Sequence, residues 1–176
     1  MDETKAPSKE AEKKALIHDL LFLLLKIGIF VLLLAGMFLF VFGVSRCSDH
    51  SMSPACKDGD LAFYYRLQQE YHPSDVIVLE QDGTTQIRRI IATGGDVVDI
   101  TEDGLKINGY LQQEPEIYAE TLPYVEGITF PVTVGPDEYF VLGDNRPQAE
   151  DSRVYGTVKH EDVKGIVITL LRRRGI

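Results

Sequence analysis

Residues 86–101, QIRRIIATGGDVVDIT, contain the pattern that decides the fold of this chain. Two runs rich in β-branched residues, Gln86–Ala92 and Asp96–Thr101, flank the dipeptide Gly94-Gly95, which favours positive φ angles. The pattern predicts two strands joined by a tight turn, because β-branched side chains pack well on a pleated sheet.

The same alternation of apolar runs and turn dipeptides recurs on both sides of this stretch. Asp82-Gly83, Asp103-Gly104 and Asn108-Gly109 are typical hairpin turns. Further strands are expected at Leu61–Tyr65, Asp75–Glu80, Leu105–Asn108, Thr129–Val134, Tyr139–Leu142 and Val163–Leu171. Many short strands with such turns predict a mainly β protein with one all-β domain.

An apolar segment precedes the β pattern. Ile27–Val44 has 18 residues without a formal charge, and Leu20–Leu25 extends the run past Lys26. A buried core helix is the alternative, but so long an apolar run exceeds what a soluble helix needs. Because no small-x-small cleavage site follows Val44, we expect a retained transmembrane anchor.

The charges beside the segment predict its orientation. Lys13, Lys14 and Lys26 lie on its N-terminal side, and only Arg46 lies close on the other side. The positive-inside rule then places the N-terminus in the cytoplasm. We expect a protein of the cell membrane with a cytoplasmic segment at 1–19, a single-pass transmembrane helix at 20–44 and an extracellular β-domain at 45–176.

The net charge of −9 lies entirely beyond residue 44, because five acidic and five basic residues cancel before it. So acidic a domain argues against a nucleic-acid partner. About 130 residues are enough for one hydrophobic core. No metal or cofactor is expected, because no cluster has metal-ligand spacing and no glycine-rich phosphate loop precedes a helix.

Two cysteines, Cys47 and Cys56, bracket Ser51. An exported domain permits a disulfide, which would fix the loop that carries the serine. Spacing does not establish the bonding geometry, so we expect two unlinked thiols and keep the bridge as the alternative. Arg46 argues against lipid modification of Cys47.

Ordered motifs follow along the chain, although a serine before Met-x-Pro is by itself common in turns. The motifs are Ser51-Met52-Ser53-Pro54, Gly59-Asp60, Arg89 with Gly94-Gly95-Asp96, and Gly143-Asp144-Asn145-Arg146 through Asp151-Ser152-Arg153. From the anchor to about Leu171 they resemble type I signal peptidases, which are Ser–Lys serine endopeptidases. The resemblance implies an N-terminal transmembrane helix, an all-β signal-peptidase-like domain and a Gram-positive source.

The resemblance also implies the chemistry. Ser51 matches the nucleophile that hydrolyses exported proteins just beyond their signal segments, after small residues at the minus-one and minus-three positions. Arg88 stands where the family has its catalytic lysine, and Ala149 stands where members commonly have a serine that supports that lysine. A buried amine can lose its proton and activate a serine, whereas a guanidinium stays charged.

Asp49 stands where the family has a small or hydroxyl residue near the oxyanion. In an extended segment Asp49 and Ser51 would project to one side, where the carboxylate could repel the oxyanion, pair with Arg88 or act as a substitute base. Met52 and Pro54 are assigned to substrate or oxyanion support. His50 is expected to point away into solvent. His18 lies at the expected membrane boundary, and His72 and His160 are expected to be exposed.

Further charged residues are assigned to support of the site. Arg89, Asp144 and Arg153 are expected to hold loops in register through buried ion pairs. Asp144 should meet Arg89, and Asp151 should meet either Arg153 or Arg88.

Two functions therefore stand side by side, with the membrane and signal segments as partners in both. One is cleavage of signal segments during protein secretion. The other is a non-cleaving role, because the chain also resembles divergent homologues of Gram-positive pilus gene clusters, which keep Met-Ser-Pro-Ala (52–55) and assist sortase in assembling pilins. An enzyme needs a base beside Ser51, for which the candidate amines are Lys57, Lys106, Lys159 and Lys164.

Overall fold

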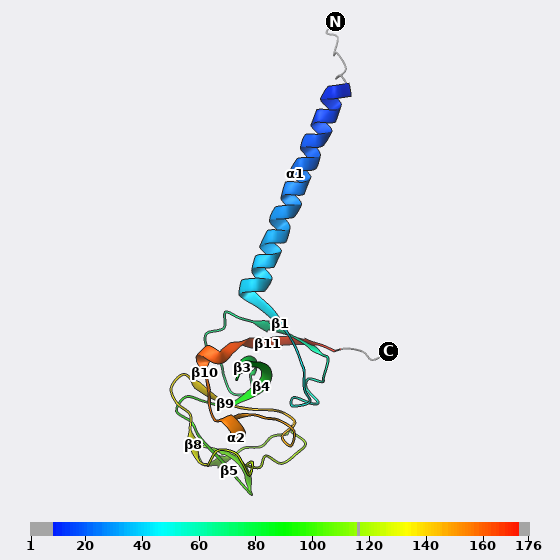
Figure 1. The fold of residues 1–176 in the computed structure, drawn as a ribbon. Helices are drawn as coiled ribbons and strands as arrows, with labels where there is room; N and C mark the ends of the chain where they lie inside the picture. Colours follow the sequence, from blue (N-terminus) through cyan, green and yellow to red (C-terminus); the bar gives the residue numbers. More distant parts are fainter. Residues whose placement is uncertain (1–8, 116, 173–176) are drawn as a thin grey trace. The chain divides into compact units, whose positions relative to one another are not determined.

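The computed structural model describes residues 9–115 and 117–172 (Figure 1). The chain divides into two compact units, residues 1–41 and 42–176, which are described separately.

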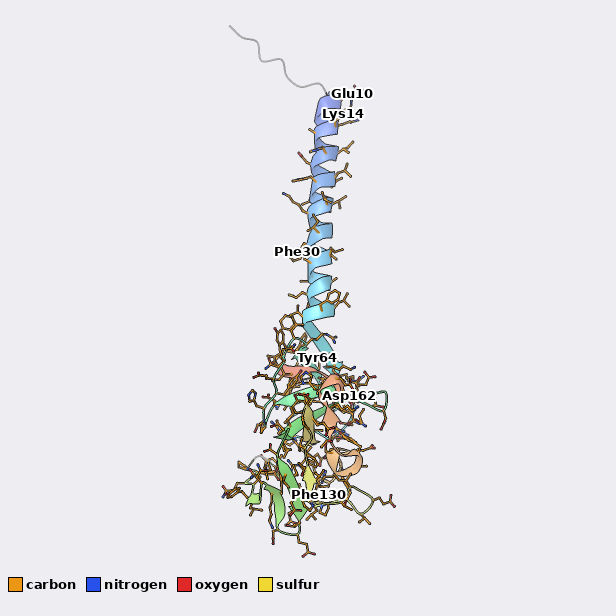
Figure 2. All side chains as sticks on the ribbon, turned by 90° about the vertical axis from the view of Figure 1, so that its left-hand side faces the viewer. Glu10, Lys14, Phe30, Tyr64, Phe130 and Asp162 are labelled. Carbon is orange, nitrogen blue, oxygen red and sulfur yellow. A yellow bond between two sulfur atoms is a disulfide. The ribbon has the colours of Figure 1, made fainter. Side chains whose placement is uncertain are left out.

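The first unit is a single long helix. Helix α1 (Lys9–Gly36) continues into a π-helical turn, η1 (Met37–Val41). Figure 2 shows side chains, Phe30 among them, projecting on all sides of it. Over Lys13–Val41 the helix is long and apolar enough to cross a membrane, by length and composition.

The predicted anchor range, 20–44, is wrong at its C-terminal end, where Phe42–Val44 form a strand instead of helix. Phe42–Arg46 is strand β1, which pairs antiparallel with β2 (Leu61–Tyr65). Gly43 lies against the ring of Tyr64, and a side chain at residue 43 would collide with that ring. Pairing with β2 and this close packing outweigh the continuous apolar pattern.

The second unit contains a seven-stranded sheet in the order β1-β2-β11-β3-β4-β9-β10, in which all neighbours are antiparallel. Its other strands are β3 (Val76–Gln81), β4 (Thr84–Thr93), β9 (Glu138–Leu142), β10 (Val158–Lys159) and β11 (Val163–Leu171). The short helix α2 (Ser152–Tyr155) and the 3-10 turn η2 (His160–Asp162) lie between β9 and β11 in the chain.

A four-stranded sheet has the order β7-β6-β5-β8. Its strands are β5 (Val97–Thr101), β6 (Gly104–Ile107), β7 (Tyr110–Leu111) and β8 (Val132–Thr133). The mainly β prediction is confirmed. Three short strands, β1, β7 and β10, were not predicted, and the predicted strand Thr129–Val134 is reduced to β8.

Two hydrophobic clusters place the site. One packs β4 and β9 against the second sheet through side chains such as Ile91, Val98 and Phe140. The other buries the segment around Ser51 against the first sheet and contains Cys47, Met52, Cys56, Ala62, Tyr64, Val78 and Ile87. The loop that carries Ser51 is therefore anchored in the hydrophobic core by these buried side chains.

Candidate functional site

Ser51 lies in a compact turn between β1 and β2, so the expected extended conformation is wrong. The Ser53 N–H donates to the His50 carbonyl at 3.1 Å, and the Cys56 N–H donates to the Met52 carbonyl at 2.8 Å. Ser51 is only 3% exposed, Met52 is buried, and Pro54 and His50 are exposed.

A disulfide joins Cys47 to Cys56, so the expectation of two unlinked thiols is wrong. The turn brings the two Cα atoms to 6.5 Å, a separation that a disulfide spans and that sequence spacing does not reveal. Both cysteines are buried in the cluster that contains Met52. The covalent ring therefore contains Ser51 and holds its turn on the sheet.

The loop after β9 fixes the backbone of the serine turn. The Asn145 N–H donates to the Ser51 carbonyl at 2.8 Å, and Asn145 Nδ2 donates to the His50 carbonyl at 3.0 Å. A Cβ added to Gly143 would lie 2.6 Å from the Ser51 carbonyl oxygen and would collide with Ala149. The Gly143–Ala149 segment thus packs directly on the serine, and Ala149 contributes only an apolar contact there.

Arg88 reaches the same region from β4 and is 1% exposed. Its Nε and Nη2 donate to the Glu150 carbonyl at 3.0 and 2.8 Å, and its Nη1 donates to the Ile87 carbonyl at 2.7 Å. Three hydrogen bonds of the guanidinium therefore go to backbone carbonyls, and no hydrogen bond to Ser51 is found among the described residues.

Asp49 joins the serine turn to this guanidinium. Its Oδ1 accepts a hydrogen bond from the Ser51 N–H at 3.1 Å, and its Oδ2 lies 3.6 Å from Arg88 Nη2. The ion pair with Arg88, one of the three possibilities for Asp49, is present. The carboxylate is about half exposed, at 48%, so screening weakens the pair.

No amine replaces the base within the described part of the chain. Lys106 pairs with Asp103, Lys159 with Glu161 and Lys164 with Glu80, while Lys57 is exposed. Ser51 Oγ has no hydrogen-bond partner in residues 9–115 and 117–172, and no fully buried side-chain oxygen or nitrogen there lacks one. The hydroxyl therefore keeps contact with solvent.

Buried ion pairs surround the site as expected. Arg89 and Asp144 form two parallel hydrogen bonds of 2.8 and 2.7 Å, so their predicted contact is confirmed. Asp151 is fully buried and meets Arg153, the first of its two expected partners. Asp151 also accepts from the Gly143 N–H at 3.0 Å, which ties the ion pair to the loop on Ser51.

Sequence reasoning missed several residues of this network. Arg146 is buried against Glu114 and Thr121, and the Arg153 guanidinium lies 4.5 Å from the centre of the Tyr124 ring. The motif position of Arg146 was the only signal available. Burial raises the pKa of the Tyr155 phenol above its ordinary value, and the nearby Arg88 charge opposes that rise.

Two spaces adjoin the serine turn. An apolar pocket of about 310 Å³ lies beside Met52, Cys56, Val76, Ile87 and Leu170. A much smaller space of about 10 Å³ separates residues 46–49 from residues 85–87, which is room for about one water molecule. The apolar pocket could take a small side chain, whereas the smaller space is nearly closed.

His160 is not exposed as predicted but half-buried in an aromatic cluster. Its Nδ1 lies 2.8 Å from the Tyr139 hydroxyl, and its ring packs against Tyr71. A hollow of about 910 Å³ adjoins this cluster and does not include Ser51. Within the described residues, no group of three or more histidine, cysteine, aspartate or glutamate side chains is placed to hold a metal ion.

Comparison with known proteins identifies a family that matches most of this chain. The profile of the family described as "Signal peptidase, peptidase S26" matches residues 20–171. The Signal peptidase I P of Bacillus subtilis subsp. natto is 28% identical over 170 residues, covering 90% of this chain and 90% of that protein. Signal peptidase I of Bacillus caldolyticus is 30% identical, with 78% of this chain and 83% of that protein covered.

Among solved structures, a signal peptidase I from Enterococcus faecalis V583 is 29% identical, with a TM-score of 0.47 over 56% of this chain and 97% of that one. The family profile covers most of the chain, from the apolar helix to the end of β11. The chain therefore belongs to the signal peptidase family, peptidase S26.

Proposed function

We propose that this protein is a membrane-anchored signal-peptidase-like protein that binds the signal segments of exported proteins and cleaves them poorly or not at all. In this proposal the N-terminus is cytoplasmic and the β-domain lies outside the cell. The observation that carries it is the environment of Arg88, which donates to two backbone carbonyls. In this proposal Arg88 takes the position of the family's catalytic lysine.

The first support is that no lysine amine in residues 9–115 and 117–172 lies beside Ser51. A serine needs a neighbouring group that takes its proton, and a guanidinium does not titrate in the range that a protein tolerates. Arg88 donates to the carbonyls of Glu150 and Ile87, and none of its hydrogen bonds among the described residues goes to the hydroxyl of Ser51. Loss of a base commonly costs two to four powers of ten in rate.

The second support is the Asp49 carboxylate. The backbone N–H of a nucleophilic serine commonly stabilises the oxyanion that forms during acyl transfer. Here that N–H donates to Asp49 Oδ1, so the carboxylate occupies one donor that the oxyanion would need. A negative charge in this place opposes a second negative charge on the substrate.

The alternative is an entirely non-cleaving role as an assembly partner for sortase-built pili. It has the same requirement for a binding cleft and differs in the role of Ser51. Since an inert enzyme and an assembly partner share this geometry, the experiment must separate turnover from biological function.

The test is cleavage of a signal-peptide substrate by the full chain in detergent micelles. We expect little or no product from the wild type. Arg88→Lys combined with Ala149→Ser supplies a titratable amine and a hydroxyl that orients it, so the double variant should exceed both single variants. Ser51→Ala in the double-variant background should abolish the gain.

Wild-type turnover at ordinary signal-peptidase rates that is lost in Ser51→Ala would refute weak cleavage and make the protein an ordinary enzyme. If the wild type is inert and Ser51→Ala leaves secretion and pilus assembly unchanged, the non-cleaving role is favoured. The double variant alone does not decide between them.

A further inference from the structure

One side of β4 is only partly covered by a neighbouring strand. Strand β3 pairs with β4 from Thr84 to Arg89, whereas β9 pairs with β4 only from Arg89 onward. Within the described residues, positions 84–88 of β4 therefore have a strand on one side only. Such an open edge accepts an extended peptide by strand addition.

The backbone groups of Ile87 face this open edge. The Ile90 N–H donates to Asp75 and the Ile90 carbonyl accepts from Ser74, so the backbone groups of Ile90 point toward β3. Backbone groups of successive strand residues point to alternate sides, so those of Arg88 also face β3 and those of Ile87 face away. The Ile87 carbonyl is therefore an acceptor that an added strand would use.

Arg88 already occupies this acceptor. Its Nη1 donates to the Ile87 carbonyl at 2.7 Å, while Nε and Nη2 hold the Glu150 carbonyl on the far side. The guanidinium thus lies on the edge of the strand, in the place of an incoming backbone N–H.

We infer that Arg88 determines which peptides the groove accepts, by holding the Ile87 carbonyl that an added strand would otherwise bind. The inference rests on the proposed function, since it takes the groove beside Ser51 to be the peptide site. A carbonyl oxygen can accept two hydrogen bonds, but Arg88 is only 1% exposed, so a peptide N–H reaches the Ile87 carbonyl only if the enclosed guanidinium moves away. Hydrogen bonds from a charged donor are stronger than those from a neutral amide, so this exchange is unfavourable. The wild type therefore binds peptides without this bond and tolerates proline or an N-methylated residue opposite Ile87.

The experiment measures fluorescence anisotropy of labelled extended peptides, with alanine at the minus-one and minus-three positions, bound to the full chain in micelles. Each peptide amide is N-methylated in turn. Arg88→Met keeps a long apolar side chain and removes all its donors. We expect Arg88→Met to bind the unmodified peptide at least fivefold more tightly than the wild type does. We also expect N-methylation at one position, which leaves the affinity of the wild type unchanged, to lower the affinity of Arg88→Met at least fivefold.

Arg66→Met is the matched control. Arg66 Nε also donates to a strand carbonyl, that of Phe42, at 3.0 Å, at the opposite end of β1 from the serine turn. This control should bind and discriminate like the wild type. The inference is overturned if Arg88→Met gains neither affinity nor a newly sensitive amide, if Arg66→Met shows the same gain, or if neither wild type nor Arg88→Met binds the peptides.

A second measurement needs no variant. In ¹⁵N-labelled wild type, the protected Arg88 Nε–H resonance should persist when peptide saturates the protein, and its loss would show that the guanidinium leaves the edge and overturn the inference. Product analysis of the same samples separates the two proposals. Rapid cleavage would refute weak turnover and leave the N-methylation pattern standing, whereas a failed pattern without cleavage would refute only the role of Arg88.

Discussion

The disulfide that encloses Ser51 should be a large contributor to the stability of the β-domain. Its covalent ring is short, with a sequence separation of 9 between Cys47 and Cys56. The entropy lost by the unfolded chain on closing such a ring corresponds to about 2.6 kcal/mol at room temperature. Removing the disulfide gives up this stabilisation. For a domain of about 130 residues, its removal should lower the melting temperature by roughly 10 °C.

The variants are Cys47→Ala with Cys56→Ala, and the control is wild type reduced with dithiothreitol, which keeps both sulfur atoms in the core. Urea unfolding of the full chain in micelles can be followed by near-ultraviolet circular dichroism of the tyrosines, since the chain has no tryptophan. The reduced wild type should lose the ring contribution alone. The alanine variant should lose more, because it also leaves a cavity beside Met52.

Two outcomes would contradict this reasoning. An unchanged urea midpoint after complete reduction of the wild type would show that the ring does not constrain the unfolded chain. A further shift on adding reductant to the alanine variant would show that reductant acts elsewhere. Amide hydrogen exchange of residues 48–56 should accelerate on reduction, because the ring holds this turn against the sheet.

Three further predictions test other parts of the structure. Asp151→Asn should lower the free energy of unfolding by about 3–5 kcal/mol in urea titrations, because it leaves the buried Arg153 charge without its carboxylate partner. The control Asp137→Asn, at an exposed turn, should change the free energy of unfolding little. The free energy of unfolding should fall as the pH rises above about 10, because the unfolded chain then releases the Tyr155 proton, whereas burial makes the folded chain retain it. Identical urea midpoints of the wild type and Tyr155→Phe from pH 9 to 11 would contradict this. Protease added to intact cells should digest the β-domain, and survival of the domain until lysis would reverse the proposed topology.

Local sequence patterns were enough to predict most of the β-domain. Alternating β-branched runs and glycine turns identified β2, β3, β4, β5, β6, β9 and β11, because strand pattern and turn conformation depend on neighbouring residues. The pair of Arg89 with Asp144 also followed from motif and charge, whereas the sequence left Asp151 with either Arg153 or Arg88 as its partner. Strand β1 did not, because Phe42–Val44 continue an apolar run whose pattern is the same in a helix and in a buried strand.

The arrangement around Ser51 depends on contacts between segments far apart in the chain. The disulfide required the folded turn to bring two Cα atoms together, and the orientation of Arg88 required the carbonyl of Glu150 from a different loop. The pattern of residues along β4 places Arg88 on a strand but cannot specify where a long side chain with several rotatable bonds finds its acceptors. The strand pattern is thus a property of local sequence, whereas the contacts around Ser51 arise from packing three separate segments against one another.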